Sequence, residues 1–153
     1  MSQLYFKGNQ ENLKEHKVAF LCSRKYPPEI VLKAYDWAIE QRKKGICVIS
    51  GFHSQIEKDV LHFLLKGTQP VIMVLARGMK RNWPPEIRKA LDDNRLLIVS
   101  PFPESVVRVS EKTAFIRNQT MIKLADELVI AHADKGGQID LLTAGLKKVL
   151  IIC

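Results

Sequence analysis

The chain has 153 residues, of which 46% are hydrophobic, and it carries a formal net charge of +8 at pH 7. This length suits one domain with a substantial core, the composition excludes a disordered chain, and the charge favours a polyanionic partner such as nucleic acid or a phosphorylated small molecule. No apolar run approaches the roughly 18 residues of a membrane-spanning helix, and the first residues lack the apolar stretch of a secretion signal, so we expect a single cytoplasmic domain over residues 1–153.

The chain contains several short apolar runs, which are typical of strands buried on both faces. Residues 1–16 show no clear period, and we expect them to form a lead-in segment or a short edge element. The predicted strands then follow at Lys17–Cys22, Ile46–Ile49, Val71–Ala76, Leu96–Val99, Glu127–Ala131 and Lys148–Ile152.

Amphipathic helices are predicted between these strands, with proline or glycine at several of their ends. The longest loop is expected at residues 100–112. The helical segments are a helix from Pro28 to Lys44, one with Ile56, Val60, Phe63 and Leu64 inward that stops at Gly67, a short one from Pro84 to about Leu91, one over Phe115–Leu124, and a last one carrying Ile139, Leu142 and Leu146. Alternation of buried strands and helices predicts an α/β fold of three layers, a Rossmann-like doubly wound and mostly parallel sheet.

Several kinds of site are disfavoured by what the sequence lacks. Cys22, Cys47 and Cys153 are odd in number and widely spaced, so buried free thiols are expected rather than disulfides or a zinc site. The four histidines have no metal-ligand spacing, and the sequence contains neither G-x-G-x-x-G, nor a P-loop, nor a nucleophile elbow. We therefore predict no catalytic residue, metal or cofactor.

The helix predicted over Phe115–Leu124 is the centre of the functional interpretation. Its apolar face is expected to carry Phe115, Ile122 and Ala125, with Met121 and Leu124 beside them, and its expected start at Phe115 places Arg117 and Asn118 near the N-terminal turn. Free backbone N–H groups and the helix dipole favour an anion there, and the guanidinium fork of Arg117 suits phosphate. The alternative is that Arg117 is an ordinary surface residue with a solvated side chain.

Small and cationic residues follow the predicted strands at the edge where parallel sheets bind ligands. Gly136 and Gly137 would let a backbone approach an anion closely, although a Gly-Gly pair between a strand and a helix is often only a turn. The candidate DNA- or phosphate-binding residues are Ser23, Arg24, Ser50, Gly51, Lys112, Arg117, Asn118, Lys135, Gly136, Gly137 and Gln138.

Five short motifs, in the same order over most of the chain, resemble those of the Rossmann-like domain of the DprA/Smf DNA-processing proteins, in the superfamily that includes the LOG-type nucleotide hydrolases. Cys22-Ser23-Arg24 corresponds to the family's G-S-R, and the stretch from Ser50 to Glu57 corresponds to S-G-x-A-x-G-I-D. Trp83-Pro84 corresponds to Y-P, and the stretch from Phe115 to Gln119 corresponds to F-x-x-R-N-R. A last stretch, which ends in Thr143-Ala144, corresponds to S-G-S-L-x-T-A. Cys22, Gln119 and the stretch from His53 to Gln55 depart from the family pattern.

The resemblance implies a binding protein rather than an enzyme. It implies single-stranded DNA in a basic pocket, a role in DNA recombination and natural transformation, contact with a RecA-type recombinase, and a possible homodimer. It also implies that Arg24 and Arg117 are phosphate ligands, with Ser23, Ser50 and Gly51 as further contacts.

Two alternatives use the same pocket. One is a small-nucleotide binder or sensor that takes a single phosphorylated ligand. The other is a LOG-type enzyme that cleaves the glycosidic bond of a nucleoside monophosphate. That group has a P-G-G-x-G-T-x-x-E turn, whereas this chain has D-K-G-G-Q-I-D-L, which lacks the Gly-Thr pair and the glutamate.

Overall fold

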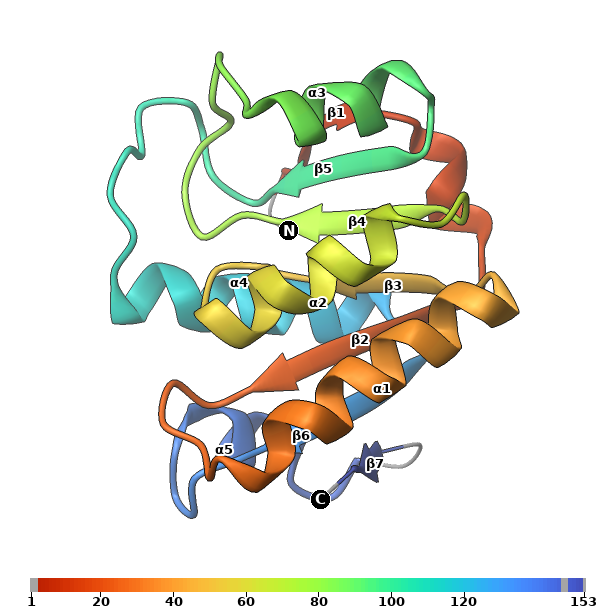
Figure 1. Ribbon diagram of the computed structural model, residues 1–153. Coiled ribbons are helices and arrows are strands. Elements are labelled where there is room, and N and C mark those ends of the chain that lie inside the picture. Colours follow the sequence, from red (N-terminus) through yellow and green to blue (C-terminus); the bar gives the residue numbers. More distant parts are fainter. Residues whose placement is uncertain (1–2, 147–148, 153) are drawn as a thin grey trace.

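A computed structural model of the protein describes residues 3–146 and 149–152 (Figure 1). Its strands are β1 (Tyr5–Gly8), β2 (Lys17–Cys22), β3 (Cys47–Ser50), β4 (Val71–Val74), β5 (Leu96–Ser100), β6 (Glu127–His132) and β7 (Val149–Ile151). They form one sheet in the order β1-β5-β4-β3-β2-β6-β7. Strand β1 pairs antiparallel with β5, and the other pairings are parallel.

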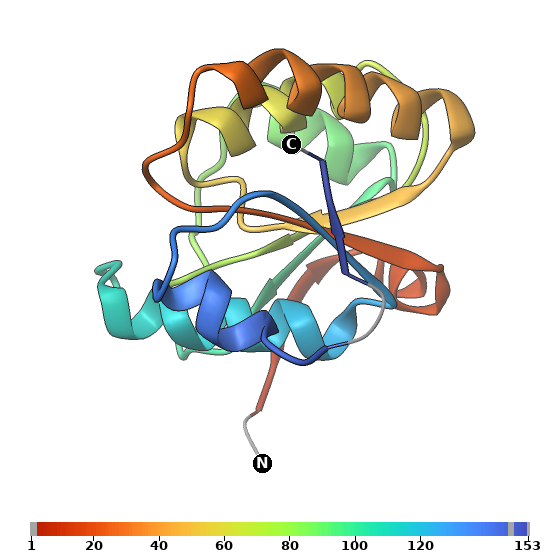
Figure 2. The same ribbon diagram turned by 90° about the horizontal axis from the view of Figure 1, so that it is seen from below.

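Helices cover both faces of this sheet, as Figure 2 shows. On one face lie α1 (Glu29–Lys44), α2 (Gln55–Leu65) and α3 (Pro85–Asp92); on the other lie α4 (Glu111–Leu124) and α5 (Gln138–Thr143). This arrangement confirms the predicted three-layered, Rossmann-like fold. The predicted strand Lys17–Cys22 matches β2 at both ends, and the other predicted elements differ from the observed ones by a few residues at their boundaries.

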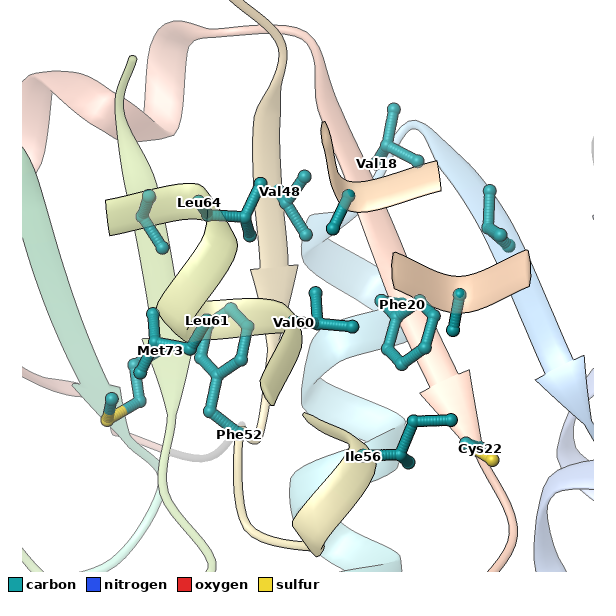
Figure 3. Packing of buried hydrophobic residues seen from close by; sticks show 14 of the residues in the cluster. Val18, Phe20, Cys22, Val48, Phe52, Ile56, Val60, Leu61, Leu64 and Met73 are labelled. Atoms are coloured by element: carbon teal, nitrogen blue, oxygen red, sulfur yellow. The ribbon is translucent and has the colours of Figure 1, made fainter. Parts of the chain in front are cut away.

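Each face of the sheet contributes its own hydrophobic core, because alternate residues of a strand point to opposite sides. Along β2, Val18, Phe20 and Cys22 pack under α1 and α2, where Figure 3 shows them, whereas Ala19 and Leu21 face the side of α4. Phe20 stacks on Trp37 of α1 with ring centroids 5.2 Å apart. The continuous apolar runs of the sequence follow from this two-sided burial.

The N-terminal segment forms an edge element, in agreement with one of the two expectations for residues 1–16. After β1, a 3-10 helix, η1 (Gln10–Lys14), carries the buried side chain of Asn12. Asn12 Nδ2 donates hydrogen bonds to the carbonyl oxygens of Val71 (3.2 Å) and Arg95 (2.7 Å). This one amide therefore ties the segment to the chain at the starts of β4 and β5.

The strand order creates a topological switch point beside β2. From β2 the chain steps outward through β3, β4 and β5, and it then returns to place β6 on the other side of β2. The connections leaving the carboxyl ends of β2 and β6 consequently diverge to opposite faces of the sheet, since β2 leads to α1 and β6 leads to α5. Open α/β sheets bind ligands in the crevice that forms at such a point.

Helix α4 differs from the prediction in its start and in its buried face. It begins at Glu111, where Ser110 and Thr113 form a capping box, so Arg117 lies in its second turn and the placement near the N-terminal turn is wrong. Phe115 is exposed, whereas Arg117, Asn118 and Met121 are buried. The predicted face is therefore confirmed at Ile122 and Ala125, which pack against the core beside Met121, and it is wrong at Phe115, because the part of α4 near the cleft buries polar side chains instead.

The C-terminal part shows a smaller difference. Helix α5 ends at Thr143, so Leu146 lies beyond it and is exposed rather than carried by the helix. Cys22 and Cys47 are free and buried as predicted. Lys148, the predicted start of the last strand, and Cys153 lie outside the described residues.

None of the helices in the described part of the chain is both long enough and apolar enough to span a bilayer.

The packing of α4 gives a stability test. We expect Met121→Ala to lower the free energy of unfolding by about 2 to 5 kcal/mol, because Met121 is fully buried in the core. Phe115→Ala, on the same helix, should cost roughly 1 kcal/mol or less because its side chain packs against neither core cluster. Urea unfolding of both variants measures the difference, and a larger loss for Phe115→Ala would contradict this packing.

Candidate functional site

A cleft of about 740 Å³ lies at the switch point, beyond the carboxyl ends of β2 and β6. The start of α2 and the first turns of α4 and α5 surround it. Its lining residues are Leu21, Cys22, Ser23, Arg24, His53, Ser54, Glu57, Val109, Ser110, Glu111, Ala114, Arg117, Asn118, Asp134, Gly137, Gln138 and Ile139. Its volume is in the range of pockets that enclose small organic ligands.

Arg117 is the most unusual of these residues because its guanidinium group is buried, with 8% of the residue exposed. Its Nε donates a 2.8 Å hydrogen bond to Asn118 Oδ1. Asn118 Nδ2 in turn donates to Gln138 Oε1 (2.7 Å), and Gln138 Nε2 donates to the Glu111 carbonyl (3.3 Å). Among the described residues no acceptor pairs with the two Nη atoms of Arg117. A buried guanidinium with unused donors, in the wall of a cleft, is suited to bind an acceptor group of a ligand.

Gly51 makes room for that guanidinium. A Cβ atom at this position would lie 2.7 Å from Arg117 Cζ and closer still to Nη1. The next residue, Phe52, has a φ of 47° and is buried, so the chain turns sharply to send its ring into the core while Gly51 stays beneath Arg117. The adjacent Ser50 hydroxyl donates to the Phe20 carbonyl at 3.0 Å and is fully buried.

Glu57 holds the N-terminus of α2 against the cleft. Ser54 caps the helix, and Glu57 Oε1 accepts hydrogen bonds from the backbone N–H groups of His53 and Ser54, each at 3.0 Å. This is a capping box, which satisfies helix N–H groups that have no partner within the helix. Only 6% of Glu57 is exposed, and its Oε2 has no hydrogen-bond partner in the part of the chain that the structure describes.

Ser23 joins the ends of the two strands that flank the switch point. Its Oγ accepts a 2.9 Å hydrogen bond from the backbone N–H of Asp134, and its own N–H donates to the His132 carbonyl at 2.8 Å. The side chain of His132 contacts Asp134 Oδ1 at 3.1 Å. The register between β2 and β6 shifts at Leu21 and Cys22, which brings Ser23 to this junction.

Burial shifts the pKa values of three side chains that line the cleft. Burial lowers the pKa of Arg117, an effect that the nearby Glu57 carboxylate partly offsets. Burial, and then the charge of Arg117, lowers the pKa of His53, so this imidazole is neutral at pH 7. Burial and the Glu57 charge raise the pKa of the Cys22 thiol to about 12, which keeps it protonated.

The charge of the cleft differs from that of the whole chain. Two guanidinium groups, of Arg24 and Arg117, and three carboxylates, of Glu57, Glu111 and Asp134, line it. The positive charge lies instead at the rim. Arg24 is exposed there, and Lys25, Lys112 and Lys135 are exposed residues that each directly follow a lining residue in the sequence.

The structure brings about half of the candidate residues into the cleft. Ser23, Arg24, Arg117, Asn118, Gly137 and Gln138 line it. Ser50 is buried beneath it and Gly51 lies under Arg117, whereas Lys112, Lys135 and Gly136 are exposed outside the lining. The burial of Arg117 contradicts the alternative in which its side chain is solvated.

The list of candidate binding residues omitted several lining residues, although Cys22 and the stretch from Ser50 to Glu57 belong to the quoted motifs. The omitted residues are chiefly Cys22, His53, Ser54, Glu57, Ser110, Glu111 and Asp134. The S-x-x-E pattern from Ser54 to Glu57 marks a capping box, and it could have placed a helix start at this edge of the sheet. Within the described residues, no group of three or more His, Cys, Asp or Glu side chains could hold a metal ion.

Comparison with known proteins gives both a family and a fold. The sequence profile of the family described as DNA recombination-mediator protein A matches residues 2–148. DNA processing protein A from Helicobacter pylori, whose structure concerns a single-stranded DNA binding mode, superimposes with a TM-score of 0.77 at 21% identity, covering 97% of this chain and 70% of that one. DNA processing protein A from Streptococcus pneumoniae gives 0.76 at 19% identity, covering 97% and 54%.

A more distant likeness is the Moco carrier protein from Chlamydomonas reinhardtii, with a TM-score of 0.52 at 7% identity, covering 90% of this chain and 88% of that one. At these identities the superpositions show the fold alone. The chain spans about half the length of the S. pneumoniae protein. No curated protein sequence matches the chain.

The contact between Gly51 and Arg117 gives a testable coupling. We expect Gly51→Ala to lower the free energy of unfolding by about 1 to 3 kcal/mol, because the new methyl group collides with the guanidinium. In an Arg117→Ala background the same change should cost nothing, because Gly51 is outside the left-handed region and alanine fits its backbone. A double-mutant cycle in urea measures this coupling, and additive effects would contradict the contact.

Proposed function

The chain belongs to the DNA recombination-mediator protein A family, and on that premise we propose that it binds single-stranded DNA at the switch-point cleft. The observation that carries the proposal is the buried Arg117 guanidinium, which has unused donors inside a cleft rimmed by exposed cations. The single-stranded DNA binding of the H. pylori protein, which shares this fold, supports the same proposal.

The rim and the interior of the cleft have different parts in this proposal. The strand's phosphates contact Arg24 and the exposed lysines at 25, 112 and 135, where solvent screens the carboxylates and cations can follow a flexible backbone. In the interior the buried Arg117 guanidinium is accompanied by the buried Glu57 carboxylate, so the interior takes an uncharged or partly charged portion of a nucleotide rather than a run of phosphates. Contact with a RecA-type recombinase, self-association and a role in transformation stay predictions of the resemblance.

A second candidate function is binding of a single small nucleotide. The specific observation in its favour is that the cleft is of small-ligand size and is rich in carboxylates, which disfavour a long polyanion inside it. The two candidates differ in what competes with a labelled oligonucleotide. A mononucleotide that displaces the strand completely at modest concentration favours the sensor, whereas weak displacement favours the DNA-binding protein.

Salt dependence tests the DNA-binding proposal. Fluorescence anisotropy with a labelled single-stranded oligonucleotide, measured between about 50 and 200 mM salt, should show affinity falling steeply as salt rises. Arg24→Ala should weaken binding and reduce the slope of log affinity against log salt by about 0.7, the loss of one phosphate contact to a single strand. The slope is the readout because a general loss of folding would not change it in this way.

The matched control is Lys43→Ala. Lys43 is also an exposed cation, but it lies in the last turn of α1, at the opposite end of the sheet from the cleft. It should leave both affinity and slope unchanged. Equal effects of the two substitutions, or binding that does not depend on salt, would contradict the proposed site.

A further inference from the structure

Arg117 and Glu57 form an unusual combination at the inner end of the cleft. Each is more than nine-tenths buried, and each lines the cleft. They attract one another, but in the part of the chain that the structure describes they form no direct ion pair. Buried charges are normally paired directly or neutralised, so a guanidinium and a carboxylate that line one cleft without pairing are both open to a ligand.

Both groups keep the atoms that such a ligand would need. The Arg117 Nε is engaged with Asn118, which leaves the two Nη atoms as donors in a fixed plane. The Glu57 Oε1 is engaged by two backbone N–H groups, which leaves Oε2 as an acceptor. The ligand must therefore present hydrogen-bond acceptors to Arg117 and a donor to Glu57.

Phosphate does not meet this requirement. It offers acceptors to Arg117, but it brings negative charge against the buried Glu57 carboxylate, where little solvent screens the repulsion. A neutral group with acceptors on one edge and donors on the next avoids that cost. Nucleobases have this property, and their size suits a cleft of about 740 Å³ that has an apolar floor of Leu21, Cys22 and Ile139.

We propose that Arg117 and Glu57 together read a nucleobase, and that they select guanine. Guanine carries the adjacent acceptors O6 and N7, which match a guanidinium edge, and next to them the N1–H and N2–H donors, which can both point at the one free oxygen of Glu57. Thymine has one ring N–H between two carbonyl acceptors, so Glu57 would face a carbonyl as well as a donor. Adenine has no adjacent pair of acceptors, and cytosine, with O2 and N3 for the guanidinium, offers the free Glu57 oxygen one amino group where guanine offers two N–H donors.

This inference rests on the proposed function and deepens it. The rim cations hold the phosphates without regard to sequence, and one base turns inward to the buried pair. The polar chain Arg117–Asn118–Gln138 fixes the plane of the guanidinium, and the capping box fixes the carboxylate. Both reading groups are thus positioned before the strand arrives, which is the condition for selective readout.

The experiment compares four labelled heptamers of thymidine in which only the central base is varied to G, A, C or T. A single G avoids the association of guanine runs. In anisotropy at fixed salt, the protein should bind the G heptamer about tenfold more tightly than the all-T heptamer, as one good bidentate base contact provides. As a second readout, GMP should displace the strand at a lower concentration than TMP.

Two variants locate the preference. Glu57→Gln keeps an oxygen for the capping box but replaces the free acceptor with an amide NH₂ group, so the preference for G should fall to within about twofold of T. Arg117→Lys keeps the charge but loses the planar fork, with the same expected loss of preference. Glu40→Gln is the control, since it removes an equal charge from the distant end of α1.

Equal binding of the four heptamers by the unaltered protein overturns guanine selection, and it leaves the DNA-binding proposal intact if that binding is salt-dependent. A uniform change for all heptamers in Glu57→Gln also overturns it, because Glu57 would then act through its charge alone. Absence of binding to every heptamer, with preferential binding of GMP over TMP, contradicts the DNA-binding proposal instead and supports the reading pair.

Discussion

The placement of one guanidinium over one glycine organises the cleft. Arg117 can lie buried in the wall of the cleft because Gly51 has no side chain, and Phe52 turns the chain away at once into the core. The buried cation then requires acceptors, which Asn118 supplies at Nε and which Asn118 in turn links to Gln138 of α5. The turn after β3, the helix α4 and the helix α5, far apart in the sequence, are therefore joined through two neighbouring side chains, Arg117 and Asn118.

The topology explains why this arrangement lies where it does. Placing β6 beside β2 sends the two following connections to opposite faces of the sheet, and the gap between them cannot be filled by either helix. Ser23 bridges the strand ends below the gap by accepting the Asp134 N–H. The fold thus produces an opening whose floor is rigid sheet and whose walls are helix starts, a combination that holds polar side chains in fixed positions.

The elements of the fold could be predicted from the sequence because burial on both faces leaves continuous apolar runs such as Lys17–Cys22. The cleft end of α4 could not, because periodicity assigns apolar residues inward and therefore favours Phe115, whereas the structure buries Arg117 and Asn118 there. The residues of the site could likewise be predicted only in part. Strand ends and family motifs point to Arg117, but the burial of Glu57 depends on the turn after β3 and on its capping box, which are features of three-dimensional packing.

The net charge of the chain does not describe the charge inside the cleft. A charge of +8 favours a polyanion anywhere on the surface, yet the buried part of the cleft pairs one guanidinium, of Arg117, with one carboxylate, of Glu57. These observations agree if cations at the rim attract the strand over a distance while the interior discriminates by hydrogen bonding at close range. Affinity and selectivity would then be carried by different residues, which a uniformly basic groove could not achieve, because phosphate contacts carry no sequence information.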